Sequence, residues 1–168
     1  MLLNVPQVQI IDDNDHQTVV KITGMYTAAC TANTVVIKSN TLYGANTSLP
    51  CLLAVNSWEY STSLANGFIA LEWVSTFNAN TTIMTSGRCN DGGVSRFIPN
   101  NANTPTGDIN LVTANAQPGD SFTLTVSFLK MLSGYQLVSG NANNYLGAIV
   151  ANTFGYGSGA WANTQVGY

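Results

Sequence analysis

The stretch SFTLTVSFLK, residues 121–130, decides the fold of this chain. From position 122 to 128, large apolar side chains at even positions alternate with threonine or serine at odd positions. A period of two is typical of a β-strand that has one face in a core and the other in water. No helical spacing of apolar residues is sustained elsewhere in the sequence. The stretch therefore predicts one strand of an all-β protein.

Similar short runs recur before this stretch, and Asn, Gly or Pro interrupts them every ~8–12 residues. The expected strands are Val8–Ile11, Thr18–Tyr26, Thr34–Lys38, Leu52–Tyr60, Phe68–Ser75, Thr81–Thr85, Val94–Ile98, Asp108–Thr113 and Ser121–Leu132. This spacing is typical of a sandwich or barrel of short strands. We expect an all-β fold, namely an antiparallel β-sandwich or a jelly-roll-like domain with an irregular C-terminal extension.

The C-terminal extension stands out because no charged side chain follows Lys130, although several aromatic residues lie among its glycines and asparagines. Such a segment lacks the charge repulsion that keeps exposed surfaces apart. We expect a β-sandwich domain over residues 1–132 and, over residues 133–168, an uncharged arm that orders against another protein. The candidate interface residues are Tyr135, Tyr145, Phe154, Tyr156, Trp161 and Tyr168.

Composition narrows the function classes. Charged residues make up 8% of the 168 residues, whereas soluble proteins average about 25%. The net charge is −3 and the five cations are scattered, which excludes the basic stripe of a nucleic-acid-binding protein. The first residues show no positive region and no long apolar run, so we expect neither a signal peptide nor a membrane anchor, and synthesis in a cytoplasm.

Three cysteines, Cys30, Cys51 and Cys89, are odd in number and widely spaced. This pattern argues against a disulfide framework and against a cysteine-based zinc site. We interpret all three as buried thiols, and a disulfide between two of them stays open.

The most acidic stretch, Asp12-Asp13-Asn14-Asp15-His16, contains the only histidine. Its oxygens are suitable ligands for calcium, but the spacing lacks the glycine and the distal glutamate of an EF-hand loop. We therefore favour a solvated turn between two strands over a cation site, and we expect no metal.

Two glutamates raise the question of catalysis. Glu59 and Glu72 each stand beside a tryptophan, as in a glycosidase with paired carboxylates and a stacking ring. Nothing in the sequence brings them together, so we interpret both as surface positions. No nucleophile elbow, phosphate loop or dinucleotide fingerprint occurs, and the pair Gly92-Gly93 is interpreted as a hairpin turn. We expect neither an enzyme nor a cofactor.

One region carries a more specific pattern. Residues 98–113 read IPNNANTPTGDINLVT, and a PGD turn at 118–120 leads into the strand that ends at Lys130. This arrangement resembles virion structural proteins of tailed bacteriophages, especially marine ones. The upstream segments VVKITG (19–24) and IALEW (69–73) resemble earlier strands of the same proteins. The resemblance covers roughly residues 17–130, and the chain departs from it after Lys130.

The resemblance implies a small all-β component of the phage particle, a capsid decoration or cement protein without enzymatic activity. Its expected partners are the major capsid protein or another virion protein, and neighbouring copies of itself in a homo-oligomer, for which we predict a trimer. Its expected location is the virion, after assembly in the host cytoplasm. We expect the arm at 133–168 to lie over an adjacent subunit or the major capsid protein.

Other functions stay open at the level of sequence. A tail, fibre or vertex component would use the same physics of assembly at a different place on the particle. A carbohydrate-binding receptor-recognition module is a competing interpretation, because β-sandwiches with exposed aromatic and Asn side chains suit sugar recognition. An all-β hydrolase is disfavoured by the single histidine and by the absence of convergent acids.

Overall fold

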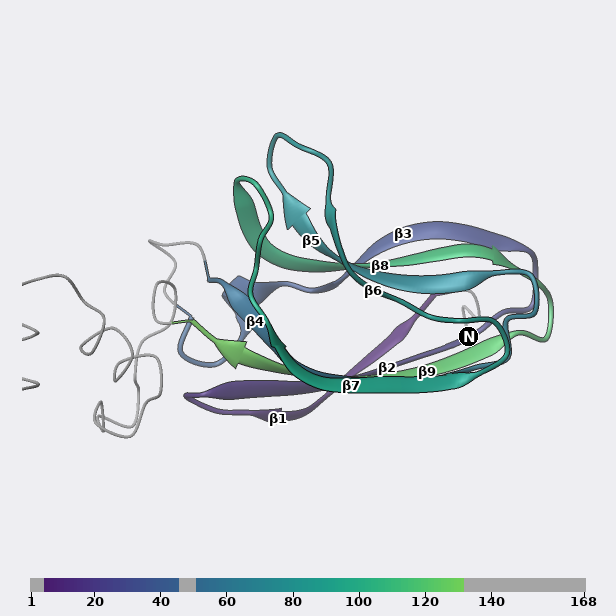
Figure 1. Ribbon diagram of the computed structural model, residues 1–168, viewed down its shortest axis with the longest axis horizontal. Coiled ribbons are helices and arrows are strands. Elements are labelled where there is room, and N and C mark those ends of the chain that lie inside the picture. The colour runs from purple at the N-terminus through teal and green to yellow at the C-terminus, as the bar shows by residue number, and fades with distance from the viewer. Residues whose placement is uncertain (1–4, 46–50, 132–168) are drawn as a thin grey trace, which may run out of the picture.

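The computed structural model describes residues 5–45 and 51–131 and confirms the all-β fold (Figure 1). These two ranges form nine strands and one short 3-10 helix, η1 (Ser39–Thr41). The strands are β1 (Gln7–Asp13), β2 (Gln17–Met25), β3 (Cys30–Ile37), β4 (Leu53–Thr62), β5 (Phe68–Ser75), β6 (Thr81–Thr85), β7 (Asp91–Ile98), β8 (Pro105–Ala116) and β9 (Ser121–Lys130). The proposed arm, 133–168, lies outside the described residues.

The strands form two antiparallel sheets that stack as a β-sandwich (Figure 1). The first sheet has five strands in the order β1-β2-β9-β4-β7, and the second has four in the order β3-β8-β5-β6. Strand β9, which the opening stretch predicts, lies at the centre of the larger sheet. Its Thr125 pairs with Lys21 of β2 on one side and with Glu59 of β4 on the other.

The core lies between the two sheets, and the alternation in β9 explains its position. The apolar side chains of β9 at positions 122, 124, 126 and 128 are all 3% exposed or less. Phe128 meets Trp73 of β5 edge-on, with ring centroids 6.3 Å apart. The same Trp73 is fully buried. Aromatic contacts of this kind join the two sheets through the strands that the sequence pattern identifies best.

A buried ion pair closes one end of the sandwich, where β9 ends. The Lys130 ammonium lies 2.6 Å from the Asp13 carboxylate, and it donates hydrogen bonds of 2.7 Å to the carbonyl oxygens of Asn14 and Tyr43. Asp13 also accepts from the Tyr43 amide at 2.8 Å and from the Thr18 hydroxyl. The acidic stretch therefore forms the expected turn between β1 and β2, but Asp13 serves as a structural anchor within it.

These contacts set the protonation of Asp13. Burial raises the pKa of its carboxyl group, whereas hydrogen bonds from Lys130, Thr18 and the Tyr43 amide, together with the Lys130 charge, lower it. The net shift is downward, which keeps the carboxylate ionised beside the buried lysine.

Two expectations about local structure are wrong. No disulfide joins the three cysteines, but only Cys51 is buried as expected, while Cys30 is half-buried and Cys89 is exposed. Gly92 and Gly93 lie inside strand β7 and form no hairpin turn. A Cβ atom on Gly93 would approach the Trp58 carbonyl oxygen to 2.7 Å, so the close pairing of β7 with β4 requires glycine here.

Candidate binding surfaces

The first candidate surface is an apolar part of β1, one of the two edge strands of the larger sheet. Val8 pairs with Ile22, and Ile10 pairs with Val20. Cross-strand partners point to the same face of a sheet, so Val8 and Ile10 lie on the core side. Ile22 and Val20 are 0% exposed, whereas Val8 is 42% and Ile10 is 50% exposed. We call these two side chains the uncovered β1 face.

The uncovered β1 face results from a mismatch between the sheets, because five strands are stacked on four. The neighbouring Ile11, at the irregularity in the register of β1, is 55% exposed and extends the apolar surface. An edge strand also presents backbone groups that no neighbouring strand pairs. Apolar side chains and a free strand edge together suit a protein segment that lies along β1.

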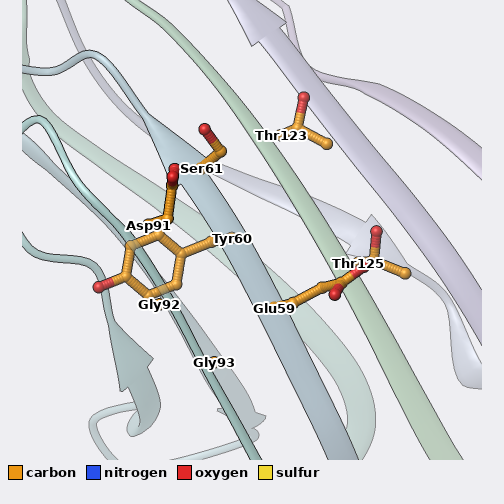
Figure 2. Close-up of a pocket in the computed structure, with 8 residues that line it drawn as sticks. All are labelled: Glu59, Tyr60, Ser61, Asp91, Gly92, Gly93, Thr123 and Thr125. Carbon is orange, nitrogen blue, oxygen red and sulfur yellow. The ribbon is translucent and has the colours of Figure 1, made fainter.

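The second candidate surface is a polar depression on the outer face of the larger sheet. One hollow of about 520 Å³ is lined by Glu59, Tyr60, Ser61, Asp91, Gly92, Gly93, Thr123 and Thr125 (Figure 2). An adjoining hollow of similar volume shares Glu59, Gly93 and Thr125. It adds Val19, Ser57, Trp58, Val94, Ser95 and Ser127. We call the two hollows together the polar trough.

Strand register explains the chemistry of the polar trough. The outward residues of β9 are its threonines and Ser127, because the alternate residues are in the core. Three cross-strand rows follow, Thr123–Ser61–Asp91, Thr125–Glu59–Gly93 and Ser127–Ser57–Ser95. Because these side chains are short and Gly93 has none, the surface is depressed along these rows. In Figure 2 the Glu59 side chain extends toward Thr125, while the Tyr60 ring extends the opposite way, beside Gly92.

The two glutamates considered for catalysis do not meet. Glu59 lies on the outer face of the five-stranded sheet, in register with Thr125. Glu72 belongs to β5 of the other sheet, where it is adjacent to the fully buried Trp73 and therefore points away from the core. Its carboxylate accepts a hydrogen bond of 3.1 Å from Asn80. The thickness of the sandwich separates the two carboxylates, as expected for two surface positions.

The oxygens of the acidic turn are occupied by its own donors. Asp12 accepts from the side-chain amides of Asn14 at 2.8 Å and Gln17 at 3.1 Å. The Asn14 side-chain oxygen accepts from the backbone amides of His16 and Gln17. Within residues 5–45 and 51–131, no three His, Cys, Asp or Glu side chains are grouped to hold a metal ion. The same ranges contain no helix long and apolar enough to cross a membrane.

The sequence did not reveal either surface directly. The candidate interface residues Tyr135, Tyr145, Phe154, Tyr156, Trp161 and Tyr168 all lie outside the described residues. The uncovered β1 face was missed because the alternation of apolar residues in a strand is the same whether or not a second sheet covers that strand. The outward threonines of β9 were identified as solvent-facing, but only strand register shows which serines and acids stand beside them.

Comparison with known proteins gives only distant likenesses. No protein-family model matches the chain. No curated protein matches it either. A family 29 carbohydrate-binding module is similar in structure, with a TM-score of 0.39 and 8% identity over 75% of this chain and 86% of the module.

Two other solved structures are similar at a comparable level. Peruvianin-I, a cysteine peptidase from Thevetia peruviana latex, has a TM-score of 0.33 and 12% identity over 79% of this chain and 66% of its own. TmCBM61 in complex with β-1,4-galactotriose has a TM-score of 0.31 and 9% identity over 76% of this chain and 90% of its own. Similarity at this level gives no information on function, which must be inferred from the surfaces of the chain itself.

Proposed function

We propose that this chain is a non-catalytic structural protein of a tailed-phage particle, a capsid decoration or cement protein that binds the major capsid protein and neighbouring copies. The observation that carries the proposal is the uncovered β1 face. Val8 and Ile10 continue the apolar rows of the core, yet they stay about half exposed. The virion assignment rests on the resemblance of residues 17–130 to phage structural proteins.

The energetics of such a contact suit a repeating lattice. Burying the exposed half of an aliphatic side chain contributes about 1 kcal/mol, so the uncovered β1 face alone gives a weak contact. A particle presents the same contact many times, and linked weak contacts bind strongly together. The low charge of the chain reduces the repulsion between adjacent copies.

The C-terminal residues supply the proposed second contact. Residues 133–168 contain six aromatic side chains and no charge, and aromatic residues are the usual anchors of protein interfaces. An arm that docks on an adjacent copy would link the two, in a trimer or a lattice. Nucleic acid and membrane have no place in this proposal, because the net charge is −3 and one of the five cations, Lys130, is buried in an ion pair.

The absence of catalysis is also part of the proposal. Glu59 and Glu72, the two glutamates considered as a possible catalytic pair, belong to different sheets. The polar trough contains Glu59 and Asp91 but lies open on the outer face of the sheet, whereas catalytic sites are usually enclosed clefts.

A pair of matched variants tests the β1 contact. We expect Ile10→Glu to weaken binding to phage particles that lack this protein by about tenfold, because a charge would be placed in an apolar contact. Gln9→Glu introduces the same side chain on the opposite side of the same strand, in register with Lys21, and should bind as the wild type does. Both positions are exposed, so circular dichroism should show folded protein in each case.

Co-sedimentation of each variant with particles measures the effect. Equal binding by Ile10→Glu and the wild type would show that the uncovered β1 face plays no part in attachment. The copy number of the chain in purified particles separates the head from the tail. A number that is equal to, or a simple fraction of, that of the major capsid protein supports a capsid site, and a far smaller number supports a tail, fibre or vertex site.

A further inference from the structure

We propose that the polar trough binds a neutral oligosaccharide, a function that goes beyond attachment to the particle. The trough spans four strands, β2, β9, β4 and β7, and four residue steps along β9 from Thr123 to Ser127. At strand dimensions it is about 13 Å long along β9 and about 14 Å wide across the four strands. An extended di- or trisaccharide has about this length and would lie along the strands.

The side chains of the trough match the hydrogen-bonding pattern of sugar hydroxyls. Threonine and serine hydroxyls both donate and accept, as sugar hydroxyls do. Thr123, Thr125, Ser57 and Ser61 present such groups at successive positions of two paired strands. The spacing of one side chain about every 7 Å along a strand and 5 Å across strands brings several sugar hydroxyls within reach at once.

Two acids add charge-assisted contacts. Glu59 and Asp91 are both exposed and both line the first hollow. A carboxylate accepts two hydrogen bonds from the adjacent hydroxyls of one sugar ring, and such bonds are stronger than neutral ones. Lys21 of β2 is in register with Thr125 but lines neither hollow.

Charge and polarity exclude other ligand classes. Among the described residues no cation lines either hollow, so Glu59 and Asp91 disfavour phosphates, nucleic acids and acidic sugars. A hydrophobic ligand would leave the threonine and serine hydroxyls without partners. Recognition by hydrogen bonds alone is weak, so we expect a Kd in the millimolar range for one copy. Many copies on one surface would raise the effective affinity.

The test uses the full chain and two isosteric double variants. Glu59→Gln with Thr125→Val removes the charge and one hydroxyl from the centre of the trough and keeps the volume of both side chains. Glu72→Gln with Thr82→Val makes the same changes at a cross-strand pair on the outer face of the other sheet. The probes are immobilised neutral di-, tri- and tetrasaccharides of gluco, galacto and manno configuration, with sialylated and sulfated glycans beside them.

We expect the wild type to bind at least one neutral probe, and the Glu59/Thr125 variant to bind it about tenfold more weakly or not at all. The Glu72/Thr82 variant should bind as the wild type does. Three outcomes would overturn the proposal: no binding to neutral probes, preference for the acidic glycans, or equal binding by both double variants. Particle co-sedimentation of the same proteins keeps this result separate from the attachment role, because the trough and the uncovered β1 face share no residue.

Discussion

Two glycines with the same backbone conformation have different surroundings. Gly107 has φ of +90° and Gly119 has φ of +94°, a region that side chains rarely adopt. A Cβ on Gly107 would lie 2.3 Å from the Cys51 carbonyl oxygen and 2.6 Å from the Ser39 hydroxyl. A Cβ on Gly119 would meet nothing within 4 Å. Alanine substitution at the two positions therefore distinguishes the cost of backbone strain from the cost of steric overlap.

We predict that Gly119→Ala lowers the free energy of unfolding by about 1–2 kcal/mol, the cost of the left-handed conformation alone. Gly107→Ala should cost more, about 3 kcal/mol or above, because the same strain is joined by overlap with backbone atoms that cannot move aside. Urea unfolding of the two variants at neutral pH measures the difference. Equal losses would contradict the packing described around Gly107.

A second prediction at this scale concerns acid. The pKa of Asp13 is lower in the folded protein than the ordinary value near 3.9, so the folded state favours the ionised form. Its contribution to stability is complete above the ordinary pKa and is lost as the pH falls through the folded-state pKa. We expect the free energy of unfolding to fall as the solution is acidified below about pH 5.

Asp13→Asn identifies the source of this acid sensitivity. The asparagine keeps an acceptor for the Tyr43 amide but has no proton to gain, so its unfolding free energy should be lower at neutral pH and should depend less on pH below about 5. Asp120→Asn, in the turn before β9, provides a control acid on a different turn. If the free energy of unfolding falls equally with acidification in Asp13→Asn and in the wild type, the acid sensitivity comes from other carboxyl groups.

At the scale of elements, β9 pairs on both sides and supplies a row of core side chains. Phe128→Ala should lower the free energy of unfolding by about 3–5 kcal/mol, since the ring is fully buried against Trp73. Phe77→Ala removes the same ring from a position that is 85% exposed and should change stability by less than about 0.5 kcal/mol. Chemical denaturation followed by tryptophan fluorescence compares them, and similar losses would place Phe128 outside the core.

Most strands could be predicted from sequence because their signals are local. Phe68–Ser75 and Thr81–Thr85 form strands with the predicted bounds. Strand β7 begins at Asp91, three residues before the expected start, because Gly92 and Gly93 pair with β4 in spite of their turn-like composition. Strand β3 likewise begins at Cys30, since pairing with β8 overrides the weak strand propensity of Ala32 and Asn33.

The candidate surfaces were harder to predict because they depend on which strands become neighbours. Asp13 and Lys130 are far apart in sequence, and only the adjacency of β2 and β9 brings them into one buried ion pair. Glu59 belongs beside Thr125 for the same reason. The exposure of Ile10 follows from the number of strands in the opposite sheet, which no local pattern contains.

At the scale of the whole molecule, the sandwich and the C-terminal residues are predicted to have separate roles. The described core, the two sheets and the Asp13–Lys130 ion pair all lie within residues 5–131. Deletion of residues 133–168 should therefore leave the unfolding free energy within about 1 kcal/mol of the full chain, while attachment to particles is lost. Thermal unfolding and co-sedimentation of the shortened chain measure the two effects. Undiminished attachment would refute the proposed arm.

The central position of β9 also governs the order in which the molecule can fold. Strands β2 and β4 of the larger sheet are joined only through β9, and the pair Gln17 with Leu129 brings together residues from near the two ends of the described chain. Pairings this distant along the sequence form slowly, because the entropy cost of closing a long loop precedes the stabilising contacts. During synthesis, β2 and β4 lack their shared partner until β9, which ends at Lys130, has been translated, and unpaired strand edges favour aggregation for that interval.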